Sequence, residues 1–181
     1  MAYALSRFRF RGRDALFFVV IMLMLLPFQV TMVPNVITLR AMGLLDTIWA
    51  IILPMTVAPF YIFLLRQYMV GLPGDMIEAA QIDGAGTLRC FIHVVLPVCQ
   101  PILGAAVALS FADCWNLVEQ PLTYLTTHTE LYPLSVVFNQ LTQQSTGVEF
   151  AGAALYTLPA LLIYLYFQND ILEGVQLTEL K

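Results

Sequence analysis

The side chains that usually perform catalysis are few and scattered in this sequence. Its two histidines, His93 and His128, stand alone rather than in a catalytic constellation. The three cysteines are an odd number, and their spacing matches neither a disulfide framework nor a zinc site. A Walker A nucleotide loop needs a lysine after glycine, but the only lysine, Lys181, ends the chain. We therefore predict no catalytic residue, no metal site and no cofactor bound by this chain itself.

A second group of chemically capable side chains interrupts an apolar run. It consists of Asp113, Trp115, Asn116 and Glu119. At the helical rise, Asp113 would lie about 24 Å beyond Pro97, in the outer half of a bilayer. A carboxylate in a membrane is costly and usually faces a bundle interior or an aqueous cavity. Residues three apart share a helical face, so a continuous helix would present these polar side chains in one direction. They are either a solute pathway, with the tryptophan ring stacking on a sugar, or interhelical contacts with an interfacial tryptophan.

The elements that position these residues are long apolar runs. Of 181 residues, 60% are hydrophobic and only 11% are charged, which excludes an ordinary soluble domain. Four runs are long enough to cross the hydrocarbon core as helices, and we place the spans at about 15–38, 47–67, 98–122 and 150–169. The net charge of −4 gives no reason to expect nucleic acid as a partner. The predicted fold is an all-α membrane protein, a single transmembrane domain over residues 1–181.

The positive charges orient these spans. Four arginines precede the first span, Arg66 ends the second, Arg89 precedes the third and Lys181 ends the chain. With both termini in the cytoplasm, seven of the eight Lys and Arg residues lie on that side, and only Arg40 falls outside. Residues 71–97 then form a cytoplasmic loop. The amide-rich segment 123–149 lies outside the membrane, on the external face.

Helix signals divide the cytoplasmic loop into two short helices. Asp75 is a good helix-start residue, and Glu78 three places later gives a spacing like that of a capping box. Gly84 and Gly86 end this helix, because glycine readily adopts the left-handed conformation. Thr87 can cap a second short helix that runs toward the third span. The loop is expected to form a compact knob on the cytoplasmic surface.

The spacing within this loop resembles the EAA loop of permease subunits of binding-protein-dependent ABC importers, a family with the MetI-like fold. That signature is E-A-A-x3-G-x9-I-x-L-P, and a valine at position 94 is the only departure from it. The matching residues are Glu78, Ala79, Ala80, Gly84, Val94, Leu96 and Pro97. Further segments are similar to the carbohydrate branch, in particular to its maltose-type second permease. They are Ala2-Tyr3-Ala4-Leu5-Ser6-Arg7, Pro59 to Gln67, and Trp115-Asn116 followed by Pro121-Leu122.

The resemblance implies a mechanism and a set of partners. It implies that the loop docks on a separate cytoplasmic ATPase subunit, which binds the ATP. A second permease subunit and an extracellular or periplasmic solute-binding protein complete the assembly in the cell membrane, surrounded by lipid. The implied coupling residues are Glu78, Ala79, Ala80, Asp83, Gly84, Leu96 and Pro97. Glu78 offers a carboxylate to a basic side chain of the partner, or only caps its own helix, and Asp83 is a contact or a solvated turn residue.

Two features of the sequence leave other interpretations open. Permeases of this type usually have six spans, and the first residues here resemble the end of the second span, so we expect two N-terminal spans to be absent. A self-contained secondary carrier or channel would need coupling charges within its spans, for which Asp113 is the one well-buried candidate. An inactive permease fragment is the remaining alternative.

Overall fold

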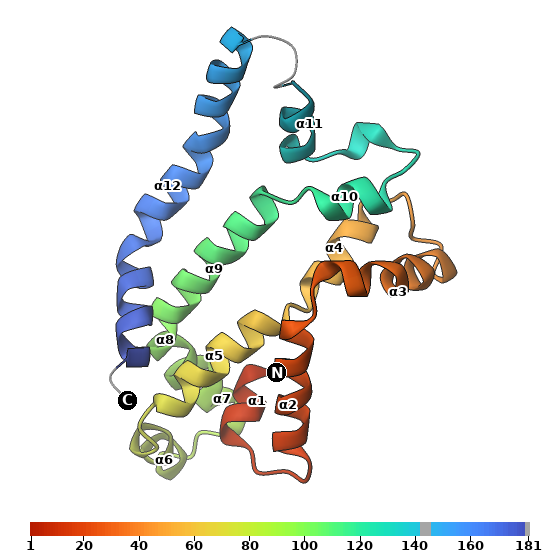
Figure 1. Cartoon of the computed structure of the whole chain (residues 1–181). Coiled ribbons are helices and arrows are strands. Elements are labelled where there is room, and N and C mark those ends of the chain that lie inside the picture. The colour runs from red at the N-terminus through yellow and green to blue at the C-terminus, as the bar shows by residue number, and fades with distance from the viewer. Residues whose placement is uncertain (142–145, 180–181) are drawn as a thin grey trace. The chain divides into compact units, whose positions relative to one another are not determined.

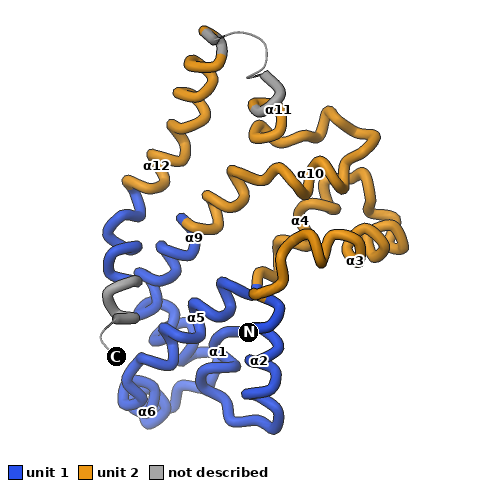
Figure 2. The backbone as a smooth tube through the Cα atoms, in the orientation of Figure 1, with its two compact units in different colours: residues 1–23, 59–108, 166–181 blue, residues 24–58, 109–165 orange. Residues whose placement is uncertain are grey.

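The computed structural model describes residues 1–141 and 146–179, whose regular structure is entirely helical (Figure 1). The predicted all-α fold is confirmed. Two predictions reach outside the described residues: the external segment 123–149 includes residues 142–145, and Lys181 ends the chain. The chain forms two compact units, and each is built from segments that are distant in sequence (Figure 2).

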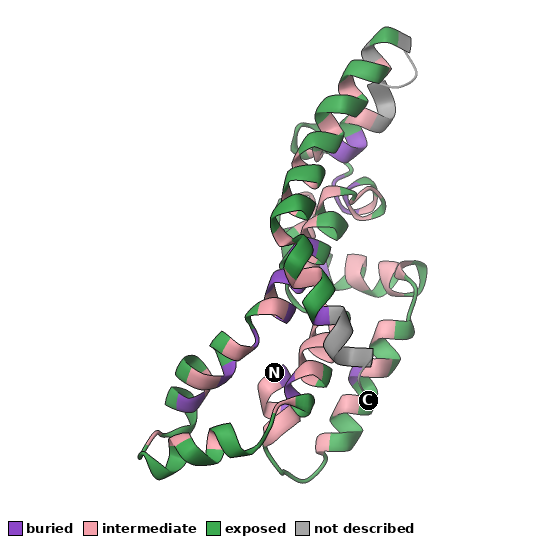
Figure 3. Ribbon diagram, turned by 90° about the vertical axis from the view of Figure 1, so that its left-hand side faces the viewer, coloured by how far each residue is buried: buried purple, intermediate pink, exposed green. Residues whose placement is uncertain are grey.

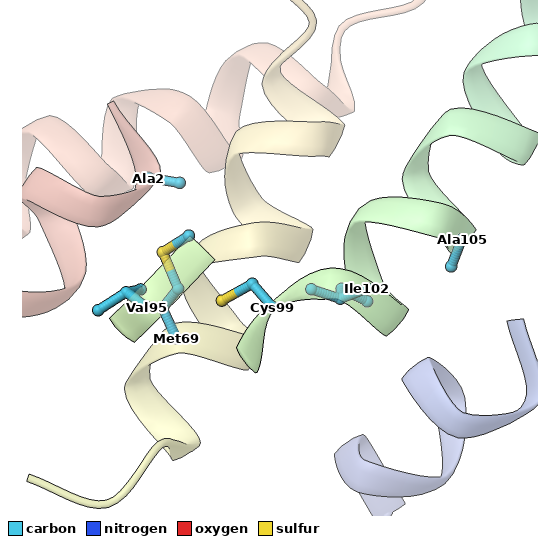
Figure 4. Close-up of a cluster of buried hydrophobic side chains, with 6 residues drawn as sticks. All are labelled: Ala2, Met69, Val95, Cys99, Ile102 and Ala105. Carbon is cyan, nitrogen blue, oxygen red and sulfur yellow. The ribbon is translucent and has the colours of Figure 1, made fainter. Parts of the chain in front are cut away.

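Unit 1 contains residues 1–23, 59–108 and 166–181. Its elements are α1 (Ala2–Arg7), most of α2 (Arg13–Leu25), α5 (Pro59–Gly71), α6 (Asp75–Ile82), α7 (Thr87–Cys90), a π-helical turn (Phe91–Val95), α8 (Leu96–Val98), the first half of α9 (Gln100–Trp115) and the end of α12 (Thr146–Glu179). Its core contains Ala2, Met69, Val95, Cys99, Ile102 and Ala105 (Figure 4). Helices α1, α5 and α9 and the π-turn therefore meet around one buried cluster.

Unit 2 contains residues 24–58 and 109–165. Its elements are α3 (Phe28–Ala41), α4 (Trp49–Thr56), the end of α9, α10 (Glu119–Tyr124), a 3₁₀ turn (Thr129–Leu131), α11 (Leu134–Leu141) and the start of α12. Leu39, Ala50 and Tyr124 form its core, where α3, α4 and α10 meet. The Tyr124 hydroxyl accepts a hydrogen bond from Asn35 at 3.2 Å, so this buried phenol is satisfied within the unit.

Among the described residues, two helical stretches are long and apolar enough to cross a membrane without a sharp bend, Trp49–Gly71 and Glu149–Gly174. Two bent pairs raise the number to four if each pair is one span: Arg13–Met24 with Phe28–Ala41, and Thr87–Val98 with Gln100–Trp115. Few positions in the two unbent stretches are buried, and Figure 3 shows that buried residues form only small clusters. Such exposed apolar helices suit lipid or partner helices as their surroundings.

Prolines explain two of the breaks in these helices. The residue before a proline is disfavoured in the helical conformation. Helix α2 accordingly stops before Pro27, and α4 stops at Thr56, from which Val57, with φ −116° and ψ 82°, leads toward Pro59 at the start of α5. Pro54 and Pro159, in contrast, lie inside α4 and α12.

The third predicted span is wrong at its outer end. It was expected to continue to residue 122, but α9 ends at Trp115 and a separate helix, α10, begins at Glu119. Pro121 lacks the amide hydrogen that a continuous helix would donate to the Leu117 carbonyl. That carbonyl instead accepts a hydrogen bond from the Ser135 hydroxyl, and the Asn116 side chain donates back to Ala112 at 2.9 Å.

Candidate functional site

The first half of the loop over residues 71–97, which the sequence predicts to be cytoplasmic, is the short helix α6. Gly74 is its N-cap and makes no side-chain cap, so the predicted capping interaction between Asp75 and Glu78 is absent. The two carboxylates instead lie in the first turn, where negative charge complements the positive end of the helix dipole. Glu78 and Ala79 are exposed, whereas Ala80 is half-buried. The Glu78 carboxylate is therefore available at the surface rather than used in capping.

The end of α6 is a Schellman motif built on one glycine. Gly84 has φ +81°, its amide donates to the Gln81 carbonyl at 3.0 Å, and the Ala85 amide donates to the Ala80 carbonyl at 2.9 Å. Gly86 differs, because its φ of −67° is open to any residue. Of the two predicted helix-breaking glycines, only Gly84 adopts the left-handed conformation. Asp83, the C-cap residue, is exposed.

The second half of the loop returns to the bundle through an irregular helix. After α7, residues Phe91–Val95 form a π-helical turn and α8 contains Leu96 and Pro97. Pro97 has no amide hydrogen, and its ring crowds the carbonyl four residues earlier, so an ordinary α-turn is disfavoured at this point. The chain then bends by 73° into α9. Leu96 and Pro97 therefore lie just before the bend that joins the loop to the third span.

The base of this loop is anchored, whereas its tip is exposed. The Arg7 guanidinium donates to the Leu72 carbonyl at 2.8 Å, and the Tyr68 hydroxyl donates to the Val98 carbonyl at 3.2 Å. Ile77 packs against the core cluster of unit 1. A rigid base with an exposed tip is suited to transmitting force from a docked partner.

Two residues of the tip were missed by sequence reasoning. Ile82 and Leu88 are 86% and 71% exposed, on either side of the Gly84 turn. Side chains exposed to this degree are free to contact the surface of a partner. The sequence did indicate them, because Ile82 and Leu88 are isolated apolar residues on either side of the two glycines in a polar part of the loop.

The polar residues at the end of the third span do not share one face. Because α9 ends at Trp115, helical periodicity no longer relates Asp113 and Asn116 to Glu119, and that prediction is wrong. Glu119 lies on α10, where both of its carboxylate oxygens accept hydrogen bonds from the Gln29 amide, at 3.3 and 3.4 Å. Gln29 was not predicted, because nothing in its local sequence indicates this contact.

Trp115 is held in an aromatic cluster with Phe111, Tyr156 and Phe138. Its ring stacks on Phe111 with a centroid separation of 5.4 Å and lies 5.3 Å from Tyr156, which stacks in turn on Phe138. The indole nitrogen donates to the Tyr156 carbonyl at 3.1 Å, and the Tyr156 hydroxyl donates to the Trp115 carbonyl at 2.7 Å. These contacts position the ring and reduce the surface that it can offer to a sugar. Tyr156 was also missed.

The fold and the loop together define an α-helical membrane protein with an exposed loop that is anchored at its base. The chain belongs to the family of binding-protein-dependent transport system inner membrane components, whose family model matches residues 1–170. This is a family of membrane transport components rather than of enzymes.

Several characterised proteins are similar to this chain. It is 29% identical over its whole length to the arabinooligosaccharides transport system permease protein AraQ of Bacillus subtilis, and it spans 65% of that protein. It is 30% identical to the polygalacturonan/rhamnogalacturonan transport system permease protein YtcP of the same species, of which it spans 68%. A crystal structure of a bacterial ABC transporter involved in the import of the acidic polysaccharide alginate matches 99% of this chain, with a TM-score of 0.70 and 27% identity, and 66% of that chain is covered.

Proposed function

We propose that this chain acts as a permease subunit of an ATP-driven importer that takes up a carbohydrate delivered by an extracellular binding protein. The observation that carries the proposal is the exposed helix α6, ended by the Gly84 turn, in a chain that matches the transport family over residues 1–170. Three similar proteins are named for arabinooligosaccharides, polygalacturonan/rhamnogalacturonan or alginate, and these names support a carbohydrate as the substrate class, although another similar protein is named for osmoprotective compounds.

The proposed coupling element is the tip of the loop. Glu78 would pair with a basic side chain of a separate ATPase subunit, and the small Ala79 would let α6 approach that subunit closely. Asp83 and Gly84 would fix the end of the helix, and Leu96 and Pro97 would transmit its movement to α9. ATP would be bound by the partner, and a second permease subunit would complete the pathway.

The proposed topology is a multi-pass subunit with both termini in the cytoplasm. The exposed loop would then face the ATPase, and the segment that follows α10 would face the binding protein. Asp113, Asn116 and Glu119 would border the solute pathway, with Trp115 held behind them by its aromatic cluster.

Co-purification tests the proposal most directly. The full chain, produced with candidate ATP-binding-cassette subunits of its own organism, should retain one of them through size-exclusion chromatography in detergent. Solute-loaded binding protein should then stimulate ATP hydrolysis by the reconstituted complex. A chain that retains none of these subunits, yet moves solute alone in vesicles, would instead be a secondary carrier or channel.

A further inference from the structure

The connection between α1 and α2 lies at the same end of unit 1 as α6 (Figure 1), and its residues line a basic hollow. An open cavity of about 470 Å³ is lined by residues 9–15. The Arg13 amide donates to the Phe10 carbonyl at 3.2 Å, and Gly12 has φ +89°, which closes a β-turn with Arg11 at its tip. The turn therefore holds Arg9, Arg11 and Arg13 around one space.

The positive charge of this hollow is not balanced within the described part of the chain. Its one carboxylate, Asp14, pairs with Arg13 at 2.9 Å. Among the described residues, no carboxylate lies within ion-pair distance of Arg9 or Arg11. Arg66 lies close enough to Arg13 for their charges to interact, with its guanidinium carbon 3.6 Å from the centre of the Phe17 ring. An anion entering here would meet at least two guanidinium groups that are free of acidic partners.

Apolar surface continues directly from this basic hollow. Leu16, Val19 and Leu23 of α2 are 42%, 50% and 49% exposed, and their spacing places them along one side of the helix. Phe8 and Phe10 alternate with the arginines and are also exposed. Segments that lie at the membrane–water interface commonly combine basic side chains with Phe and Leu in this way. A ligand that fits both parts has an anionic head and an apolar tail.

We propose that residues 9–13 bind the phosphate group of an anionic phospholipid, whose acyl chain lies along Leu16, Val19 and Leu23. The β-turn presents Arg9 and Arg11 to the phosphate, and Arg13 lies at the first turn of α2, where the helix dipole also favours an anion. A soluble phosphate would use only the basic part of this site. An acidic protein surface would leave the apolar side of α2 unexplained.

Binding of one lipid in neutral detergent tests the proposal. The full chain is titrated with dioleoyl-phosphatidylglycerol and, separately, with dioleoyl-phosphatidylcholine, and bound lipid is counted by native mass spectrometry. Each arginine near an anionic headgroup contributes about a fivefold change in affinity, so the double variant Arg9→Gln/Arg11→Gln should bind phosphatidylglycerol roughly 25-fold more weakly. The charge-conserving variant Arg9→Lys/Arg11→Lys should retain most of the binding, which separates lost charge from lost folding.

A matched control and a competitor decide between the alternatives. Arg40→Gln removes an exposed arginine outside the hollow and should leave phosphatidylglycerol binding unchanged. The proposal is overturned if Arg40→Gln weakens binding as much as the double variant, or if the double variant binds like wild type. It is also overturned if inorganic phosphate displaces the lipid at equal concentration, or if the double variant loses only an ATPase subunit and keeps the lipid. This binding assay needs no transport, so its outcome is independent of the proposed function.

Discussion

At the scale of single residues, Gly84 decides where α6 ends. Its φ of +81° is disfavoured for residues with a side chain, and a Cβ atom added there would meet nothing within 4 Å. A substitution would therefore act through backbone conformation alone, not through a steric clash. Gly86, two residues later, has equal space but an ordinary φ. Comparing the same substitution at Gly84 and at Gly86 therefore separates the effect of backbone conformation from the effect of side-chain size.

We expect Gly84→Val to disrupt the turn at a cost of about 1–3 kcal/mol in local stability, because the left-handed conformation is strained for a β-branched residue. The amides of Gly84 and Ala85, which close the Schellman motif, should lose protection in hydrogen exchange. Solute-stimulated ATP hydrolysis by the complex should fall at equal permease abundance.

Gly86→Val is the control, and it should retain both amide protection and stimulated hydrolysis. Gly84→Asn should be milder than Gly84→Val, because asparagine tolerates the left-handed region. If Gly84→Val kept full stimulation, the loop would not be the transmission element.

Asp46 is a second residue held in the left-handed region, with φ 59°. Its carboxylate accepts hydrogen bonds from the Thr127 amide at 2.8 Å and from the Thr126 hydroxyl at 3.3 Å, and its own amide donates to the Tyr124 carbonyl. The Thr127 hydrogen bond is the main reason why the pKa of Asp46 is lowered from 3.8. The residue joins the loop after α3 to the segment after α10.

The pH dependence of this connection follows from the direction of the pKa shift. Because the folded state lowers the pKa, the ionised carboxylate stabilises the connection above the ordinary pKa, and this contribution is lost as pH falls through the folded value. Asp46→Ala should therefore lower thermal stability at pH 7, and the difference from wild type should shrink as pH is lowered below 4. A constant difference between pH 7 and pH 3 would show that backbone strain, not the carboxylate, accounts for the effect.

At the scale of helices, sequence reasoning located the apolar runs well and their interruptions less well. The expected run at 150–169 lies within the unbent stretch Glu149–Gly174, and the run at 47–67 overlaps Trp49–Gly71 except for its first two residues, because length and hydropathy are local properties. Pro27 and Pro59 stand at breaks between helices, but local sequence does not distinguish them from Pro54 and Pro159, which lie inside helices. Surrounding packing decides which proline breaks a helix.

The polar end of α9 shows why the candidate pathway was only partly predictable. Pro121 is a local signal for a break in the helix. The hydrogen bond from Ser135 to the Leu117 carbonyl, in contrast, joins residues 18 positions apart, so local sequence does not indicate it. The contact between Gln29 and Glu119 spans 90 positions. Residue types indicated polar chemistry, but only the folded chain determines the partners. The EAA-like loop was more predictable because its turn depends on neighbouring residues.

Close packing between α9 and α12 in unit 1 gives a prediction about Gly104. A Cβ atom built on this glycine would lie 2.8 Å from the Cβ atom of Asp170, which is closer than real side chains approach. Gly104→Ala should therefore destabilise the protein by about 1–3 kcal/mol, measured by thermal unfolding in detergent.

Asp170→Gly in the same chain should recover most of this loss, because it removes the atoms that clash. Asp170→Ala should recover less, since its Cβ atom remains. Gly147 is the matched control, because a Cβ atom there meets nothing within 4 Å, and Gly147→Ala should be neutral or slightly stabilising. Equal destabilisation by both alanine substitutions would contradict the proposed contact.

At the scale of the whole molecule, unit 1 carries the exposed loop and unit 2 carries the polar residues that follow α9. If the proposed function is correct, substitutions in the two places should fail in different assays. Docking of an ATPase subunit should depend on the loop. Solute passage should depend on the polar residues, while docking and basal hydrolysis should not.

A substitution at Ile82 tests whether docking of an ATPase subunit depends on the loop. Its side chain is 86% exposed, and burying it against a partner would contribute about 1.5–3 kcal/mol. Ile82→Asp should therefore weaken retention of the ATPase subunit at least about tenfold in a pull-down titration, without changing the fold of the isolated chain. Gln81→Asp introduces the same charge at the neighbouring exposed position and should have a much smaller effect. Equal losses in both variants would indicate general charge repulsion instead of an apolar anchor.

A substitution at Glu119 tests whether solute passage depends on the polar residues of unit 2. Glu119→Gln keeps the size of the side chain but removes the charge that accepts the Gln29 hydrogen bonds, so Gln29 becomes freer to move. We expect solute uptake by the reconstituted complex to change by several-fold, as for the loss of one hydrogen bond to a charged group, while ATPase-subunit retention remains at the wild-type level.

Gln29→Ala should shift uptake in the same direction, and the double variant should add little to either single change, because both remove one contact. Glu130→Gln, which removes an exposed acid that pairs with His128, is the control for lost negative charge and should leave uptake unchanged. If Glu119→Gln instead released the ATPase subunit, or if uptake fell equally in the Glu130 variant, Glu119 would have no specific role in the solute pathway.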